Sequence, residues 1–174
     1  MNAIDNYQRD KNMDCIKIEI VPQENKISVW NNGKGIPIEI HKDAECYVPE
    51  MIFGQLLTSS NYNDDQRKVT GGRNGFGAKL ANIFSSKFIL ETADSRKKKH
   101  YRQVFRKNMS EKEEPVITNS ASESYTCVTF FPDLRKFKME SMEDDMVSLL
   151  TKRAYDLAGV SDSRVKVLLN GQRI

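Results

Sequence analysis

The chain has 174 residues, of which 39% are hydrophobic and 29% charged, and this composition is typical of one globular domain. Nine glycines and five prolines are too few for a collagen-like chain, and the longest apolar runs fall far short of the ~20 residues that a bilayer span needs. The 27 lysines and arginines exceed the 24 acids by only three, which is too slight an excess to indicate a nucleic-acid-binding protein.

The first half of the chain predicts a helix, a strand hairpin and a second helix. The segment 1–13 has the pattern of the end of a helix that is polar on one side. Apolar and polar residues alternate in 15–20 and again in 26–30, which predicts an antiparallel hairpin. Apolar residues at helical spacing in 48–57 predict a helix. The polar, glycine-bearing stretch 58–77 is long for a compact domain, and we therefore expect a functional loop there.

The second half of the chain predicts further strands and two further helices. We expect Ser141 and Gly159 to start and stop the longer helix, because they occupy the positions of a capping residue and a terminating glycine. The polar stretch 111–123 is expected to be a surface connection, and Asn170-Gly171 is the strongest short hairpin signal. The expected elements are helices at 78–84 and 141–159, and strands at 87–92, 100–105, 125–131 and 165–169.

The order of these elements predicts the fold class. Strands grouped as hairpins, with helices between them and no regular strand-helix alternation, are typical of an α+β sandwich. We therefore expect a mainly antiparallel mixed sheet covered on one face by helices. One domain would span 1–174, and its abrupt start and short final strand predict that it is truncated at both ends.

A glycine-rich run, Gly71 to Lys79, leads into the helix expected at 78–84, and its glycines have the spacing GxxGxG. Because glycine has no Cβ, such a backbone can turn its N–H groups toward phosphate oxygens, and the following helix adds the positive end of its dipole. Arg73 and Lys79 could add positive charge. The run indicates a phosphate-binding loop, and the alternative is a surface loop whose glycines serve only turns.

Two common nucleotide-binding loops do not fit this run. A P-loop needs Gly-Lys followed by Ser or Thr, whereas Gly77 is followed by Ala78. The dinucleotide fingerprint needs a strand directly before the glycines, whereas a polar stretch precedes these.

A second motif, Asn31-Asn32-Gly33-Lys34-Gly35-Ile36-Pro37, follows the strand expected at 26–30. Its two glycines allow a sharp turn, and the amide of Asn31 can both accept from and donate to the edge of an adenine ring. The alternative is an ordinary Asn-Gly turn at the end of a strand.

Two further groups of polar residues could contribute to the same site. Asn2, Asp5 and Asn6 are spaced so that they project from one side of a helix. Amide oxygens at this spacing can join a Mg²⁺ shell, which takes few protein ligands beside phosphates, although a solvated helix end is the alternative. Thr58-Ser59-Ser60-Asn61 offers hydroxyls and an amide to ribose and phosphate oxygens, or equally to helix capping.

The order of these parts resembles one ATPase superfamily, the Bergerat-type (GHKL) fold shared by gyrase, Hsp90, MutL and histidine kinases. Within it, the chain is similar to the ATPase domain of the eukaryotic type IIA DNA topoisomerases, topoisomerase II. The resemblance covers nearly the whole chain. The runs that carry it are 6–14, 27–37, 53–62, 70–84 and 125–139.

The resemblance implies ATP and Mg²⁺ as cofactors and a role for each matching residue. Asn2 matches the family's Mg²⁺-binding asparagine, Asn6 the residue one helical turn on that approaches the nucleoside, and Asn31 the residue that faces the adenine amino group. Thr126 matches the threonine that closes the adenine pocket. The remaining implied nucleotide-binding positions are Gly35, Ile36, Ser59, Ser60, Asn61, Gly72, Arg73, Asn74, Gly75, Phe76, Gly77, Ala78 and Lys79.

The resemblance also implies a function for the whole protein. The parent enzyme would use ATP to close a dimeric gate and pass one DNA duplex through another, in the nucleus, with no membrane partner. The family's general base is a glutamate that would precede Met1, so no catalytic residue is expected in this chain and weak hydrolysis is expected from it.

Two alternatives remain. The first is another ATPase of this fold, Hsp90-like or MutL-like, which the runs 55–62 and 73–79 disfavour. The second is a nucleic-acid-binding module without nucleotide chemistry, which would depend on the basic run 96–102.

Overall fold

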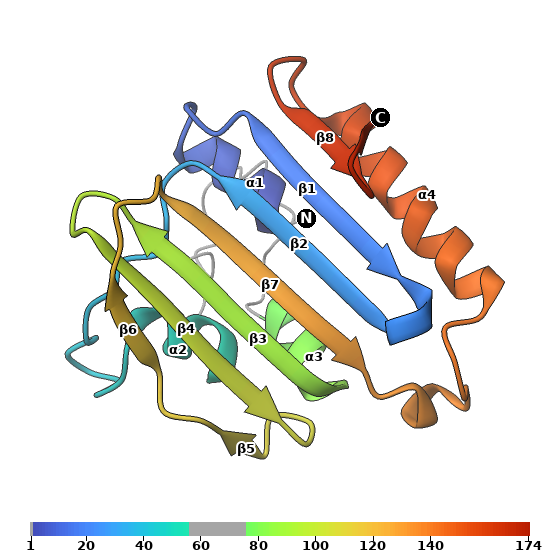
Figure 1. The fold of residues 1–174 in the computed structure, drawn as a ribbon, viewed down its shortest axis with the longest axis horizontal. Coiled ribbons are helices and arrows are strands. Elements are labelled where there is room, and N and C mark those ends of the chain that lie inside the picture. Colours follow the sequence, from blue (N-terminus) through green and yellow to red (C-terminus); the bar gives the residue numbers. More distant parts are fainter. Residues whose placement is uncertain (1, 56–75) are drawn as a thin grey trace, which may run out of the picture.

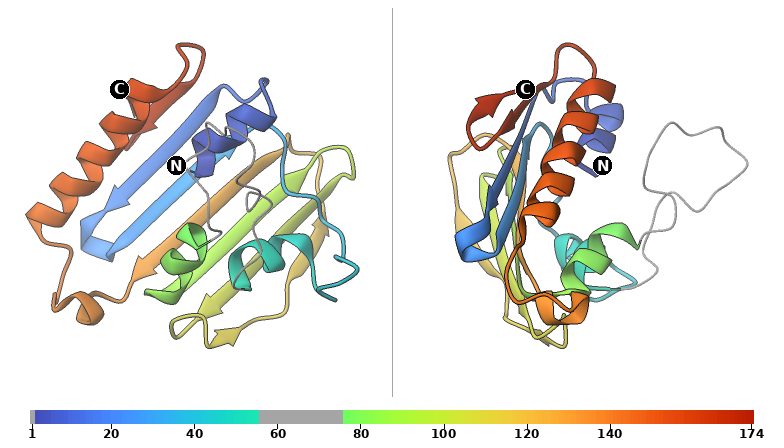
Figure 2. Two further views of the ribbon diagram at one scale, coloured as in Figure 1. Left: turned by 180° about the vertical axis from the view of Figure 1, so that it is seen from behind. Right: turned by 90° about the vertical axis from the view of Figure 1, so that its right-hand side faces the viewer.

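The computed structural model describes residues 2–55 and 76–174, and this part of the chain holds one sheet and four α-helices. The helices all lie against the same side of the sheet, as the edge-on view in Figure 2 shows. The expected α+β sandwich with helices on one face is therefore confirmed.

The sheet has nine strands within the described residues. They are β1 (Cys15–Val21), β2 (Lys26–Asn32), β3 (Ser85–Asp94), β4 (Lys99–Arg106), β5 (Glu111–Lys112), β6 (Val116–Asn119), β7 (Tyr125–Pro132), β8 (Lys166–Leu169) and β9 (Gln172–Arg173). Their order across the sheet is β5-β4-β3-β7-β2-β1-β8-β9, and β6 also pairs with β4 (Figure 1). The pairs are antiparallel except for β1 with β8, which is parallel, so the sheet is mixed as expected.

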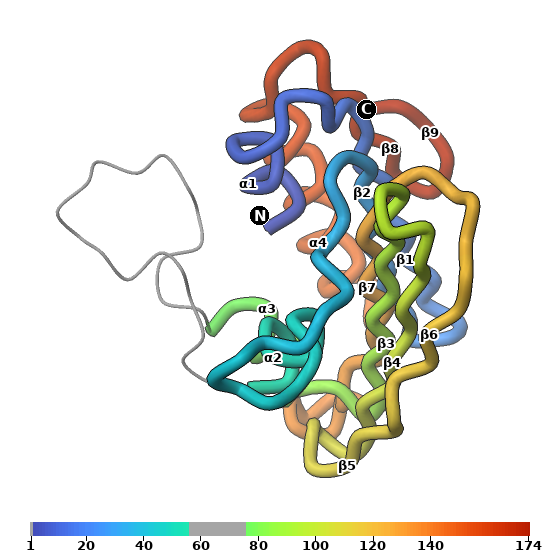
Figure 3. Tube along the Cα trace, turned by 90° about the vertical axis from the view of Figure 1, so that its left-hand side faces the viewer, coloured from blue at the N-terminus to red at the C-terminus, as the bar shows by residue number. Residues whose placement is uncertain are grey.

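The helices form two pairs on the covered face. They are α1 (Asn2–Arg9), α2 (Val48–Gly54), α3 (Gly77–Ile83) and α4 (Asp144–Val160), with short 3₁₀ helices η1 (Pro22–Glu24) and η2 (Leu134–Phe137). Figure 3 shows α1 and α4 over one half of the sheet and α2 and α3 over the other. None of the helices in the described ranges is long and apolar enough to cross a membrane.

The alternation of residue types along the strands directs the apolar side chains to the helices. In β1, Ile16 and Ile20 are buried, whereas Lys17 and Glu19 between them are exposed. A side-chain period of two places alternate residues on opposite faces, so the buried set faces the helices and the charged set faces solvent.

Each helix pair covers its own apolar cluster. Under α1 and α4, the cluster includes Ile4, Tyr7, Ile16, Leu157 and Val167. Under α2 and α3, the cluster includes Ile38, Phe53, Phe88, Leu90, Tyr101 and Phe105. The strip of sheet between these two clusters is where the polar residues of the candidate site lie.

The final hairpin follows its sequence signal. Asn170 and Gly171 both have positive φ, 48° and 82°, which is the backbone of a type I′ turn. The Asn170 side chain also accepts a hydrogen bond from the backbone N–H of Ile20 at 2.8 Å, so the turn is attached to β1 as well. The expected Asn-Gly hairpin is confirmed.

Two predictions from the sequence are wrong. The stretch 111–123, expected to be a surface connection, contains β5 and β6; both have mostly exposed side chains and therefore lack the burial pattern that identifies a strand. The long helix begins at Asp144 and not at Ser141, because the buried Met142 is held by a hydrogen bond from its N–H to Asn25 Oδ1 at 2.9 Å. It also continues past Gly159 to Val160.

Candidate functional site

A break in the apolar pattern of the covered face marks the candidate site. One row of paired residues crosses five strands: Ile16, Asn31, Thr126, Thr92 and Tyr101. Residues paired in this way direct their side chains to the same face of the sheet. The two end members are fully buried in the two apolar clusters, whereas the three between them are polar. The row therefore forms a polar floor between the helix pairs.

Thr92 lies at the centre of the hydrogen bonds in this floor, and its side chain is 0% exposed. Its hydroxyl donates to the carbonyl oxygen of Tyr125 at 2.8 Å and accepts from the backbone N–H of Ile36 at 3.0 Å. Thr126 Oγ1 lies 3.4 Å from Thr92 Oγ1. Thr92 therefore joins β3 both to β7 and to the loop that follows β2.

Asn31 is buried next to Thr126, its partner in the strand pairing. Its Nδ2 donates to the carbonyl oxygen of Asn32 at 2.8 Å, which turns the Oδ1 end of the amide toward other donors. The neighbouring Asn32 has a different role, because its Oδ1 accepts from the backbone N–H groups of Asp14 and Cys15. Within the motif 31–37, Asn31 thus belongs to the polar floor, and Asn32 holds the start of β1.

The loop 33–36 is held tightly on two sides. On one side, Asp10 Oδ2 accepts the backbone N–H of Lys34 at 2.7 Å. On the other, Gly35 approaches β3 so closely that an added Cβ would lie 2.0 Å from the carbonyl oxygen of Ala93. Gly33 has φ +89°, a conformation that favours glycine. Both glycines of the motif are therefore required by the backbone geometry.

Helix α1, which contacts β2, carries the two candidate asparagines. Asn2 is exposed and Asn6 is half-buried, with its Nδ2 3.9 Å from the sulfur of Met13. The helix is anchored by Tyr7, whose hydroxyl donates to Asp162 Oδ2 at 2.8 Å. Hydrogen bonds from Arg164 to Asp162 hold the pKa of that carboxyl well below its usual range.

Helix α3 carries the end of the glycine-rich run. Phe76 and Gly77 are exposed, Ala78 is half-buried, and Lys79 is only 2% exposed. Burial lowers the pKa of the Lys79 ammonium group. Asn82 Nδ2 donates to the carbonyl oxygen of Phe53 at 3.1 Å and so fixes α3 to the last turn of α2. The candidate residues Ser59, Ser60, Asn61, Gly72, Arg73, Asn74 and Gly75 lie outside the described residues.

The structure brings together Asn31, Thr126, Gly35 and Ile36, which the resemblance assigns to one nucleotide site, and it adds two residues that the sequence reasoning missed. Thr92 could have been found, because it is a polar residue in the inward phase of a strand whose neighbours in that phase are Leu90 and Phe88. Asp10 gave no comparable signal, since acidic residues are common at helix ends.

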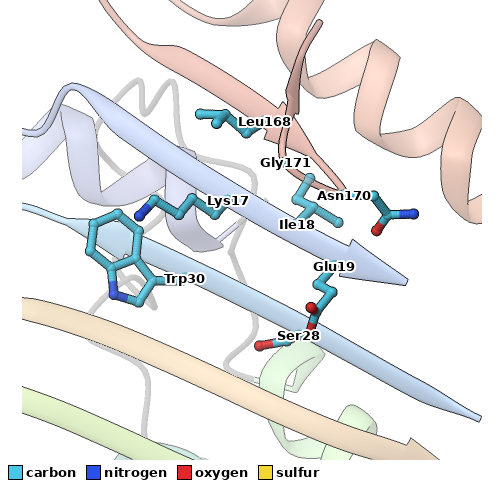
Figure 4. Close-up of a pocket in the computed structure, with 8 residues that line it drawn as sticks. All are labelled: Lys17, Ile18, Glu19, Ser28, Trp30, Leu168, Asn170 and Gly171. Atoms are coloured by element: carbon cyan, nitrogen blue, oxygen red, sulfur yellow. The ribbon is translucent and has the colours of Figure 1, made fainter. Parts of the chain in front are cut away.

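A shallow pocket of about 330 Å³ lies on the opposite, uncovered face of the sheet (Figure 4). Lys17 extends over the indole of Trp30, with its Nζ 4.3 Å from the ring centroid. Glu19, Ser28, Leu168, Asn170 and Gly171 complete most of the lining. Its position on the other side of the sheet separates this pocket from the polar floor.

Residues 1–136 match the family model described as histidine kinase-, DNA gyrase B- and HSP90-like ATPase, and this match covers more than half of the chain. The chain belongs to this ATPase family. Its helix-covered sheet is thus the fold of the histidine kinase-, gyrase- and HSP90-like ATPases, and the expected superfamily is confirmed.

Individual relatives of this ATPase family are similar over the whole chain. DNA topoisomerase 2-beta of Gallus gallus is 60% identical over 174 residues, and that of Homo sapiens is 59% identical. The crystal structure of the ATPase region of Saccharomyces cerevisiae topoisomerase II is 51% identical, with a TM-score of 0.95 over 99% of this chain and 46% of that one. The chain spans 11% of the length of the two vertebrate relatives.

Proposed function

We propose that this chain is the ATP-binding part of a eukaryotic topoisomerase II. The whole enzyme would use ATP binding and hydrolysis to drive closure of a dimeric gate and passage of one DNA duplex through another. The observation that carries this proposal is the polar floor of Asn31, Thr126 and Thr92, which lies in a chain with 60% identity to a DNA topoisomerase 2-beta.

The floor fits the base of ATP better than a purely apolar ligand. Asn31 and Thr126 offer polar atoms in a largely buried strip, and Ile16 and Tyr101 continue the row on either side inside the apolar clusters. Small-molecule sites typically combine apolar surroundings with a few well-placed polar groups. A base would be oriented by the amide and hydroxyls, with its triphosphate directed to the glycine-rich run 71–79.

We propose Asn2 as a Mg²⁺ ligand of the bound nucleotide. It is exposed on α1 and offers one neutral oxygen. That suits an ion that keeps several waters and takes phosphate oxygens as its other ligands. Within the described ranges no group of three or more His, Cys, Asp or Glu residues could hold a metal, so this proposal makes the nucleotide phosphates necessary for binding the ion.

We further propose double-stranded DNA as the substrate, a second copy of the whole protein as partner, and a nuclear location. These proposals are supported by the similarity to proteins named DNA topoisomerase 2, and they concern the longer protein of which the chain would be one domain.

The basic run 96–102 gives little support to the alternative, a nucleic-acid-binding module. Acidic neighbours neutralise part of it. Lys97 Nζ lies 2.5 Å from Glu39, and Arg102 Nε lies 3.8 Å from Glu91. If the alternative were correct, duplex DNA would bind with a strong salt dependence that is lost when the lysines at 97–99 are replaced.

The test of nucleotide binding is thermal unfolding with and without Mg²⁺ and a non-hydrolysable ATP analogue. At a ligand concentration 100 times the dissociation constant, binding stabilises the folded state by ~2.7 kcal/mol. Gly77→Val is expected to abolish the rise in melting temperature without unfolding the protein. Among the described residues, an added Cβ at Gly77 meets no atom within 4 Å outside its chain neighbours and its own helix backbone, so the variant should fold while covering the backbone that phosphates would approach.

Gly159→Val is the matched control, because Gly159 is also an exposed helical glycine whose added Cβ meets nothing within 4 Å beyond its own helix in the described part of the chain. It should keep the full rise. A folded wild-type protein without any rise would contradict the proposed function, and a full rise in Gly77→Val would contradict the role of the glycine-rich run.

A further inference from the structure

The hydroxyl of Thr92 has one proton, and its hydrogen bonds fix where that proton lies. The Tyr125 carbonyl oxygen, 2.8 Å away, can only accept, so the proton is directed at it. The backbone N–H of Ile36, 3.0 Å away, can only donate and occupies one lone pair. Toward any third neighbour, Thr92 Oγ1 can therefore act only as an acceptor.

Thr126 Oγ1 is that third neighbour, at 3.4 Å. Because Thr92 must accept in this contact, the Thr126 hydroxyl is its donor, and the proton of Thr126 is directed away from the ligand side. The lone pairs of Thr126 remain for another group. Thr126 is half-buried and lies between Asn31 and Thr92 in the row of the floor, so a ligand on the floor could reach its hydroxyl oxygen.

Asn31, like its strand partner Thr126, presents a hydrogen-bond acceptor. Its Nδ2 is engaged with the carbonyl oxygen of Asn32, which leaves Oδ1 as the accepting end. Two adjacent residues of the floor thus present acceptors. An adenine amino group donates hydrogen bonds and matches them, whereas the carbonyl oxygen at the same position of guanine is an acceptor and would face lone pairs.

We propose that Thr92 is a positioning residue that sets the preference of this site for adenine over guanine. It acts through Thr126: by committing its own proton to Tyr125, it makes the Thr126 hydroxyl an acceptor on the ligand side. Without the Thr92 oxygen to accept its proton, the Thr126 hydroxyl can rotate and donate to a guanine carbonyl. This inference rests on the proposed ATP binding and goes beyond it in assigning the selectivity to a residue beneath the floor.

The experiment compares Thr92→Val with Thr92→Ser. Valine preserves the shape of the side chain and removes the hydroxyl, whereas serine keeps the hydroxyl. Dissociation constants for non-hydrolysable ATP and GTP analogues with Mg²⁺ are measured by calorimetry on each folded variant. The ratio of the GTP to the ATP constant is expected to fall about tenfold in Thr92→Val, the factor that one hydrogen bond is worth, and to be restored in Thr92→Ser.

Thr129→Val is the matched control. Thr129 lies on the same strand as Thr126, but its hydroxyl is 3.0 Å from that of Ser28 on the uncovered face. This variant loses a threonine hydroxyl from β7 without touching the floor. Its selectivity ratio is expected to equal that of the wild type even where its melting temperature falls.

The possible outcomes separate the inference from the proposed function. An unchanged ratio in folded Thr92→Val overturns the inference, as does a wild-type protein that binds both analogues equally, and either result leaves ATP binding in place. A wild-type protein that binds neither analogue overturns the proposed function as well. If Thr92→Val does not fold, Thr92→Cys replaces it, because a thiol is only a weak acceptor. Its ratio of the GTP to the ATP dissociation constant is expected to be at least about threefold lower than that of the wild type. A wild-type ratio in Thr92→Cys overturns the inference.

Discussion

Gly35 illustrates at the scale of single residues how tightly the loop after β2 is packed. A Cβ at this position would lie 2.0 Å from the carbonyl oxygen of Ala93, which belongs to the backbone of a central strand and cannot move aside. Gly35→Ala is therefore expected to lower the free energy of unfolding by about 3 kcal/mol, the upper part of the range for overpacking. Urea denaturation measures this change.

The control for Gly35→Ala is Gly159→Ala. Outside its own helix, its new methyl group meets no atom of the described residues within 4 Å, and alanine is favoured over glycine in helices by roughly 1 kcal/mol. The control should be as stable as the wild type or more so. Wild-type stability in Gly35→Ala would contradict the close approach of the loop to β3.

Single residues of the site differ in how far the sequence predicted them. Asn31 and Thr126 are far apart in the chain, and their proximity was predicted only through the resemblance to a known fold. The structure accounts for this proximity by the antiparallel register of β2 and β7. Thr92 was missed because a threonine fits any strand by propensity, and its role depends on contacts with Ile36 and Tyr125 from two other segments.

At the scale of elements, strands with one buried face were predicted well. Apolar and polar residues alternate along β1 and β2 because the sheet has a helix-covered and an uncovered face, and this alternation is visible in the sequence. By contrast, every residue of β7 is half-buried. β5 and β6 each pair with β4 at the edge of the sheet and have mostly exposed side chains, so their sequences show no such alternation. The start of α4 depends on the distant Asn25, which local capping rules cannot include.

The contact between α1 and the turn after α4 leads to a pH-dependent prediction. Tyr7 and Arg164 both donate to Asp162, and the pKa of Asp162 is lowered in the folded state, chiefly by Arg164. A lowered carboxyl pKa adds stability at neutral pH, and this stability is lost as the pH falls below the unfolded-state value of ~3.9 toward the folded-state pKa. Asp162→Asn is therefore expected to be less stable than the wild type at neutral pH, with a difference that shrinks below about pH 4.

Guanidinium denaturation at a series of pH values measures this difference. Lys152→Met is a suitable control, because it removes an exposed ion pair to Asp156 within α4 and leaves the α1 contact unchanged. The role assigned to the carboxylate would be contradicted if Asp162→Asn and the wild type differed in free energy of unfolding by the same amount at neutral and at acidic pH.

For the whole molecule, the strand order predicts how protection from hydrogen exchange is distributed. β3 and β7 each pair with strands on both sides, whereas β9 and β5 are two-residue strands at the two edges. Amides of β3 and β7 should therefore exchange only through large-scale opening, and those of β5 and β9 through local fraying. Mass spectrometry of peptides after timed exchange measures this, and equal rates in the centre and at the edges would contradict it.

The position of β7 in the strand order also bears on how the protein is made. β1 with β2 and β3 with β4 are neighbours in sequence and can pair as soon as they leave the ribosome, whereas β7 is synthesised later and inserts between the two hairpins. Until β7 inserts, Asn31 and Thr92 lie in two separate hairpins, and the polar floor is not continuous. Such non-local pairing is slow, so the ability to hold a nucleotide would be among the last properties that a nascent chain acquires.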